Sequence, residues 1–120
     1  MLCAAPGHRK DVVGHRKDIA GYLYGIAAEC AIKQMMIPLR LPFQYDKQYI
    51  FHTHFPELRT LLRDALGKRK GIPLVVFIND DAFMNNWNVR MRYADADQIL
   101  PHWITAWQRD ARRVVNAMGA

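Results

Sequence analysis

Cysteine is scarce in this chain of 120 residues and occurs only at Cys3 and Cys30. Two thiols cannot build the disulfide framework of a small secreted domain. The amino-terminal residues lack the apolar run of a signal peptide, and no stretch is apolar for roughly 18 residues or more, the length that spans a bilayer. We therefore expect a cytoplasmic chain without a membrane partner, in which Cys30 behaves as a small buried hydrophobe.

The short motifs of common nucleotide hydrolases and zinc proteases are also missing. No GxxxxGK phosphate loop, GxSxG elbow or HExxH helix occurs in the sequence. His52 and His54 alternate in "FHTH", and imidazole suits zinc, but two ligands are too few for a zinc site. We predict no cofactor and no metal, and we expect these histidines to cap a helix or to pack in a loop.

Positive charge exceeds negative charge, with 17 Lys and Arg residues against 11 Asp and Glu and a formal net charge of +6. Such a balance attracts anionic partners and favours phosphate-bearing ligands, although a mildly basic protein without such a ligand is the alternative. The length fits one domain, which we place at residues 15–120 after a polar lead-in at 1–14. The sequence GHRKD begins in this lead-in and recurs seven residues later.

Residues 18–36 show the spacing of an amphipathic helix, because apolar residues recur every three or four positions. These residues are Ile19, Leu23, Ile26 and Cys30. We expect the face that they form to be buried, with Asp18 as the N-cap. Glycines and alanines in the same stretch would let a neighbouring helix approach closely. Glu29 and Lys33 are four residues apart, so they can pair on the helix surface or face a site.

Three further helices are predicted after this one. Residues 56–66 begin with Pro56 and place leucines on one face before Gly67, a typical helix stop. Residues 73–91 begin with PLVVFI, which we predict to be helical because Pro73 suits a first turn and no second strand-like run is available for pairing. Residues 101–118 carry an apolar stripe that includes Trp103 and Trp107. The patterns predict an all-α protein, an antiparallel up-and-down bundle of four to five helices.

Two pieces of the sequence resemble a known family. AGYLYGIAAECAIK at 20–33 is similar to the signature helix of HEPN domains, which ends in a Glu-Cys-Ala-x-Lys type sequence. WNVRMRY at 87–93 resembles the Trp-x4-Arg-Tyr segment of one branch, and HTHFPELRTLL at 52–62 is similar to that branch's His-x3-Leu helix. The resemblance covers about residues 15–118. It implies a HEPN-like bundle that forms a homodimer and associates with nucleotide, with RNA or with a small nucleotidyltransferase, as in toxin–antitoxin pairs.

Many HEPN proteins are metal-independent ribonucleases. Their motif is an Arg followed after about four to six residues by a His, a pair that can move a proton and stabilise charge on the phosphate. Counting from Arg92, the fifth and sixth residues are Asp97 and Gln98, and the first histidine is His102. The standard catalytic pair is therefore missing at the expected position, and we lean against an enzyme.

The sequence contains two other arrangements of Arg and His. A bend before the last predicted helix would let Arg90 or Arg92 act with His102 in a divergent ribonuclease. Arg9 and His15 have a suitable spacing, but they precede the signature helix, and the GHRKD duplication produces that spacing by itself. We expect them to belong to a solvated amino-terminal turn.

The best remaining cluster joins the two signature pieces in a shared groove. It consists of Glu29, Lys33, Trp87, Arg90, Arg92 and Tyr93. Its cations would hold phosphate, an aromatic ring would stack on a base, and Glu29 would orient a cation. The alternative is that both aromatic residues pack in the core and that the arginines pair with nearby aspartates, namely Asp80, Asp81 or Asp95.

From these residues we predict a non-catalytic nucleotide- or RNA-associated binding module. A divergent ribonuclease is the first alternative. The second is a purely structural dimerisation unit, whose small-residue helix at 18–36 would be the interface.

Overall fold

The computed structural model describes residues 9–41, 47–93 and 98–119, with side chains described for 18–41, 49–91 and 98–119. In chain order the elements are α1 (Arg9–Met36), η1 (Ile37–Leu39), α2 (Lys47–Phe51), α3 (Glu57–Leu66), α4 (Pro73–Ile78), η2 (Val89–Tyr93) and α5 (Pro101–Met118). Within those ranges there is no strand, so the all-α prediction is confirmed for them. None of the helices described is both long and apolar enough to cross a membrane.

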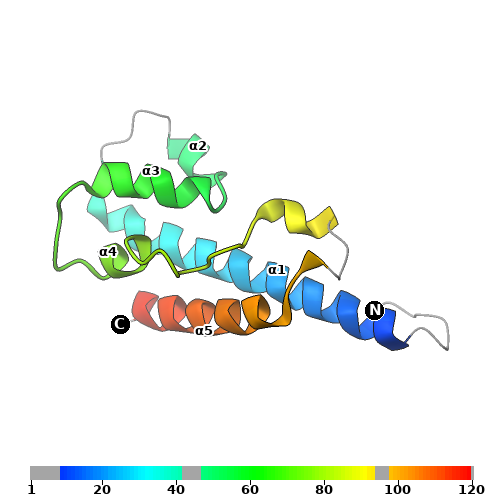
Figure 1. Cartoon of the computed structure of the whole chain (residues 1–120). Coiled ribbons are helices and arrows are strands. Elements are labelled where there is room, and N and C mark those ends of the chain that lie inside the picture. The colour runs from blue at the N-terminus through cyan, green and yellow to red at the C-terminus, as the bar shows by residue number, and fades with distance from the viewer. Residues whose placement is uncertain (1–8, 42–46, 94–97, 120) are drawn as a thin grey trace.

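The long helix α1 forms the spine of the fold. Helix α5 packs beside it, and the two run in the same direction (Figure 1). The chain returns between them through shorter helices and loops, of which α3 and α4 pack on each other and η2 packs on α1. The antiparallel up-and-down arrangement of four to five helices stays a prediction.

Proline and glycine mark the helix ends largely as the sequence predicts. After α1 the chain passes through Pro38 in η1 to Arg40, whose φ of 48° lies in the left-handed region. Pro73 and Pro101 begin α4 and α5, where the missing N–H has no partner to lose. Gly67, with a φ of 58°, ends α3. Glycine adopts such an angle without the steric cost that a Cβ imposes.

The predicted apolar stripe of α3 faces the core, and that of α5 does so in part, because Val115 and Met118 are exposed. Helix α3 buries Leu58, Leu62 and Leu66, which lie one turn apart. Helix α5 buries Trp107 and Val114 among others. Burying a leucine side chain of this kind stabilises a fold by roughly 1.5–3 kcal/mol, so these stripes account for the docking of both helices.

The buried face of α1 is not the predicted one. Ile19 and Leu23 are 42% and 55% exposed, and Cys30 is exposed as well. The residues that α1 buries are Gly21, Gly25, Ala28, Glu29, Ala31, Ile32 and Met36. The prediction that Cys30 lies in the core is therefore wrong.

The reason for this reversal is the volume of two indoles. A Cβ on Gly25 would overlap the ring of Trp87, and a Cβ on Gly21 would lie 3.0 Å from Cζ3 of Trp107. Close packing against large rings requires a surface without side chains, and α1 supplies it where its glycines are. The core side of α1 thus combines the small residues, at which the sequence predicts a close approach, with Ile32 and Met36.

Two predicted boundaries are also wrong. Helix α1 begins at Arg9, so Asp18 lies inside the helix and is not its N-cap. Helix α4 ends at Ile78 and does not continue to Met91. The following sequence, NDDAFMNNWN at 79–88, is rich in side chains that compete with helical hydrogen bonds. Oδ1 of Asp80 accepts the N–H of Ala82 (3.0 Å), a local bond that favours a turn.

Candidate functional site

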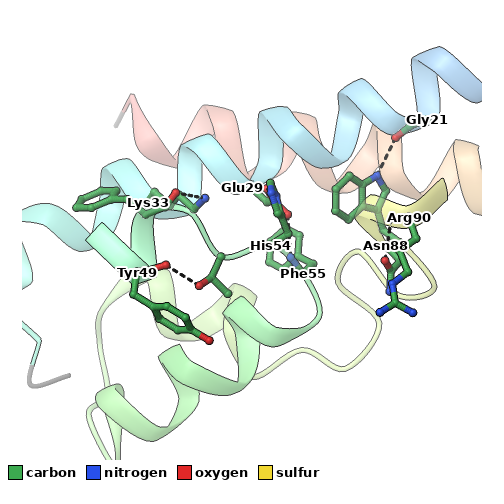
Figure 2. A network of polar contacts seen from close by, with 11 residues as sticks. Gly21, Glu29, Lys33, Tyr49, His54, Phe55, Asn88 and Arg90 are labelled. Carbon is green, nitrogen blue, oxygen red and sulfur yellow. Dashed lines mark hydrogen bonds and ion pairs between the residues drawn. The ribbon is translucent and has the colours of Figure 1, made fainter. Parts of the chain in front are cut away.

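Glu29 is a buried carboxylate held by the segment that joins α2 to α3. It is 2% exposed, and its Oε2 accepts the backbone N–H of Phe55 (2.8 Å). Its Oε1 lies 2.7 Å from Nδ1 of His54 (Figure 2). An ionised carboxylate can only accept hydrogen bonds, so Nδ1–H of His54 donates to it. These two bonds offset the cost of burying the charge of Glu29. The bond to His54 also fixes the orientation of the imidazole, whose Nε2 makes no bond to Glu29.

Lys33 lies one turn after Glu29 and binds the same segment. Its Nζ donates to the carbonyl oxygen of Phe51 (2.6 Å), at the end of α2. Glu29 and Lys33 therefore hold the chain at residues 51–55 from one side of α1, as Figure 2 shows. The sequence allowed them to pair with each other or to face a ligand, and the structure gives each of them a partner in this segment.

The segment has further internal bonds that fix its course. Oγ1 of Thr53 donates to the carbonyl oxygen of Tyr49 (2.7 Å), and the hydroxyl of Tyr49 donates to Oε1 of Glu57 (2.9 Å). Thr53 is buried, whereas His52 is exposed and His54 has 39% of its side chain exposed. The two histidines therefore remain accessible on a segment whose backbone is held in place.

A surface hollow of about 510 Å³ lies between this segment and the start of η2, and we name it the His54 groove. One side is lined by residues that include His52, His54 and the carboxylate-bearing Glu57, and the other by Asn88, Val89 and Arg90. Ligand pockets in proteins are commonly about 300–1,000 Å³, so the groove has room for a small phosphate-bearing molecule.

Arg90 is the exposed cation of this groove. Its backbone N–H donates to Oδ1 of Asn88 (2.9 Å), which fixes the first turn of η2 where Arg90 projects (Figure 2). Among the residues whose side chains are described, no carboxylate forms an ion pair with the Arg90 guanidinium. A guanidinium in this condition can donate to an anionic ligand without first breaking such a pair.

Trp87 belongs to the core and is not an accessible stacking surface. It is 2% exposed, and its indole N–H donates to the carbonyl oxygen of Gly21 (3.1 Å). Its ring stacks on Tyr22 and meets Phe55 edge-on, with ring centroids 5.9 and 6.2 Å away. For Trp87 the structure matches the core-packing alternative, and Phe55 links it to the segment that Glu29 holds.

The aspartates expected near the arginines bind other groups. Asp81 pairs with Arg63 (2.5 Å), and the Nε of Arg63 donates to the carbonyl oxygen of Ile78 (2.9 Å). Arg59 lies over the ring of Phe83, and its pKa is lowered, first by burial and then by the charge of Arg63. This cluster joins the loop after α4 to α3. Asp95 lies outside the described residues.

The loop at 79–88 is also held by α5. The buried carboxylate of Asp110 accepts the N–H of Met84 (2.9 Å), and the indole N–H of Trp107 donates to the carbonyl oxygen of Asn85 (2.8 Å). These bonds fix the position of Asn88 at the end of the loop, although the loop contains no helix. The position of Arg90 thus depends on α5 as well as on α1.

The remaining predicted residues are placed as follows. The backbone of Arg92 and Tyr93 lies in η2, and their side chains are outside the description. His102 is exposed on the first turn of α5, where its ring meets Trp103 edge-on. It does not line the His54 groove. Of the six predicted ligand-binding residues, Arg90 lines the groove, while Glu29 supports it from behind through His54.

His54 and Asn88 are the residues that the sequence-based site left out. By residue type His54 can bind zinc, but across the described side chains no group of at least three His, Cys, Asp or Glu residues could hold a metal ion. The sequence did not indicate its partner, because the burial of Glu29 on the glycine-bearing face of α1, which creates the need for a donor, is known only from the structure. What the sequence did not show is which donor, because His54 lies 25 positions away.

Comparisons with known proteins were made at three levels. A scan against protein-family models finds no match, and searches of curated proteins and of solved structures find none either.

Proposed function

We propose that this chain is a nucleotide- or RNA-binding helical module that holds phosphate in the His54 groove. The observation that carries the proposal is the shared groove of Arg90 and His54, with Nδ1 of His54 engaged by a buried carboxylate. A guanidinium donates hydrogen bonds to phosphate oxygens, and with Nδ1–H bound to Glu29 the imidazole of His54 does so through Nε2 only when both ring nitrogens carry a proton. The net charge of +6 adds a longer-range attraction for such anions.

Contacts among the three HEPN-like pieces support a HEPN-like domain as part of this proposal. Trp87 of the WNVRMRY piece packs against Gly21 and Gly25 of the AGYLYG piece. Glu29, in the same first piece, binds His54 of the HTHFPEL piece. Residues from all three pieces therefore line the groove or support it. By the same resemblance, the proposed protein partner is a small nucleotidyltransferase, as in toxin–antitoxin pairs of cytoplasmic proteins.

Self-association through α1 completes the proposal. Ile19 and Leu23 are large apolar side chains exposed on the same face of the helix, with the exposed Cys30 two turns further on. An apolar face of this kind gains free energy when a second copy covers it. None of these three residues lines the His54 groove.

Titration calorimetry with ribonucleoside 5′-monophosphates and a short mixed-sequence RNA tests the binding function. Removing the guanidinium with Arg90→Ala should weaken binding about tenfold or more, since a hydrogen bond to a charged group contributes roughly 1.5–3 kcal/mol. Arg112→Ala is the matched control, because Arg112 is exposed and lines no part of the groove. Equal affinities for the wild type and Arg90→Ala, with the helical circular dichroism retained, would rule out this site.

Cleavage of RNA is the second candidate function, and the Glu29–His54 pair is the observation that favours it. A carboxylate that orients an imidazole is a common arrangement for general acid–base catalysis. In such a reaction Nε2 of His54 would take the proton of a 2′-hydroxyl while that oxygen attacks phosphorus. The bond from phosphorus to the 5′-oxygen would break, and the leaving oxygen would take a proton from water.

An RNA cleavage assay separates the two functions. The binding proposal predicts no cleavage by the wild type beyond the level of a buffer blank. Cleavage that disappears in His54→Ala and persists in His102→Ala would replace it with catalysis at the groove. Cleavage that depends on His102 would instead support the arrangement with Arg90 or Arg92 that the sequence allowed.

A further inference from the structure

A second surface hollow of about 420 Å³ adjoins the His54 groove, and we name it the Trp103 hollow. Its lining includes Asn86, Asn88, Arg90, Met91, Gln98 and Trp103. Asn88 and Arg90 line both hollows, so these two residues form the boundary between them. A ligand bound at Arg90 can therefore extend to either side.

The chemistry of the Trp103 hollow differs from that of the groove. Asn86, Asn88 and Gln98 are exposed amides, each with donors and an acceptor, and Met91 and Ile99 add apolar surface. Trp103 is half-buried, with its ring tilted by 37° against Trp107 at a centroid distance of 6.3 Å. A flat ligand with apolar faces and a polar edge fits such a lining, and a nucleobase has this form.

The rim of the hollow is built in a fixed conformation. Met84 and Asn86 have φ angles of 52° and 70°, in the left-handed region. The bond from the Met84 N–H to Asp110 and the bond from Trp107 to Asn85 hold this turn against α5. An amide on a turn that is held in place keeps its position before the ligand arrives, which lowers the entropy lost on binding.

From these observations we propose that the Trp103 hollow is a nucleobase subsite, which takes the base of a nucleotide whose phosphate is held at Arg90 in the His54 groove. The ring of Trp103 contacts the face of the base, and the amides of Gln98 and Asn86 bind its edge. This inference rests on the proposed function. It specifies the side of Arg90 on which the base lies and the residues that bind the base.

The test compares ligands that differ by the base alone. Calorimetry is performed with ribose 5-phosphate, with the common ribonucleoside 5′-monophosphates and with a short single-stranded RNA. At least one monophosphate should bind about tenfold more tightly than ribose 5-phosphate, because stacking on an aromatic side chain and edge hydrogen bonds both require the base. Tight binding of the RNA with weak binding of every monophosphate would identify RNA as the source of the base, provided that the variants below weaken it.

Variants of the lining residues test whether the preference for a ligand with a base arises in the Trp103 hollow. Gln98→Ala removes an exposed amide without touching the core, and it should reduce the preference for base severalfold. Trp103→Ala should abolish the preference, whereas Trp103→Phe should keep most of it because an aromatic face remains. Asn116→Ala is the control, since Asn116 is an exposed amide outside the hollow.

The outcomes separate this inference from the proposed function. If phosphate compounds bind in an Arg90-dependent manner but the base adds nothing, the nucleobase subsite is wrong and the phosphate groove stands. The subsite is also wrong if a base preference exists and neither Gln98→Ala nor Trp103→Ala changes it. If no phosphate compound binds at all, both proposals are wrong.

Discussion

The hydrogen bond between Glu29 and His54 can be measured as a coupling free energy. Glu29→Ala removes a carboxylate that is 2% exposed and leaves the N–H groups of His54 and Phe55 without their acceptor. Each of the two bonds to the ionised carboxylate contributes roughly 1.5–3 kcal/mol, so the single variant should lose about 3–6 kcal/mol of unfolding free energy. That is a large part of the roughly 5–15 kcal/mol that stabilises a typical domain.

A double-mutant cycle isolates the pair from the rest of this loss. His54→Ala and the double variant Glu29→Ala/His54→Ala complete the cycle, and the contribution of the Phe55 N–H cancels because it is lost in both Glu29 variants. His54 has 39% of its side chain exposed, so we expect a coupling at the low end of the range, about 1.5 kcal/mol. Urea unfolding followed by tryptophan fluorescence provides the free energies.

Two additions keep this measurement decisive. If Glu29→Ala does not fold, Glu29→Gln retains an acceptor for the Phe55 N–H and measures the effect of removing the negative charge alone. The exposed pair of Tyr49 and Glu57 serves as the reference, with Tyr49→Phe and Glu57→Ala expected to couple by roughly 0.5 kcal/mol or less. A Glu29–His54 coupling as small as that of the reference pair would refute the view that the carboxylate fixes the imidazole.

Three further substitutions test other parts of the structure. Gly25→Ala should lower the free energy of unfolding by at least about 1–3 kcal/mol because the new Cβ overlaps the ring of Trp87. Gly119→Ala is the control and should have little effect, because a Cβ there makes ordinary contacts. Equal stabilities of the two variants would contradict the close packing at Gly25. Leu23→Glu should shift the sedimentation coefficient from dimer to monomer at unchanged helicity, and a wild type that is already monomeric at high concentration would contradict the proposed homodimer. Arg40→Gly should raise the melting temperature slightly, by a gain of up to about 1 kcal/mol, because glycine tolerates a φ of 48°; Arg40→Ala should show no such gain.

The helices with strong end signals were predictable because those signals are local. Pro73, Pro101 and Gly67 act through their own backbone angles and hydrogen bonds, so no tertiary information is needed to interpret them. The leucine stripe of α3 was predictable for the same reason, since its spacing of one turn is a property of the sequence. By contrast, the end of α4 depended on a competition between turn-forming side chains and an apolar spacing that continued to Met91.

The buried face of α1 and the partner of Glu29 were not predictable from local patterns. A hydrophobic face is recognised by its apolar side chains, but α1 buries Gly21 and Gly25 because indoles from distant segments occupy the space. Similarly, a glutamate on a helix is usually solvated, and its burial here depends on a donor 25 positions away. Arg90 was predicted to be a site residue from its neighbours in sequence, and the structure places it in the groove. Lys33, the other predicted cation with a described side chain, does not line the groove.

Helix α1 has 28 residues and, at about 1.5 Å per residue, forms a continuous rod of about 42 Å. One side of this rod carries Glu29 and Lys33, which form hydrogen bonds to the chain around His54. Another side carries the exposed Ile19 and Leu23. Any partner that tilts or rotates α1 therefore also moves Glu29 and Lys33, which support the His54 groove. By thermodynamic linkage, a ligand that favours one setting of the rod changes the affinity for that partner by the same factor as the partner changes the affinity for the ligand.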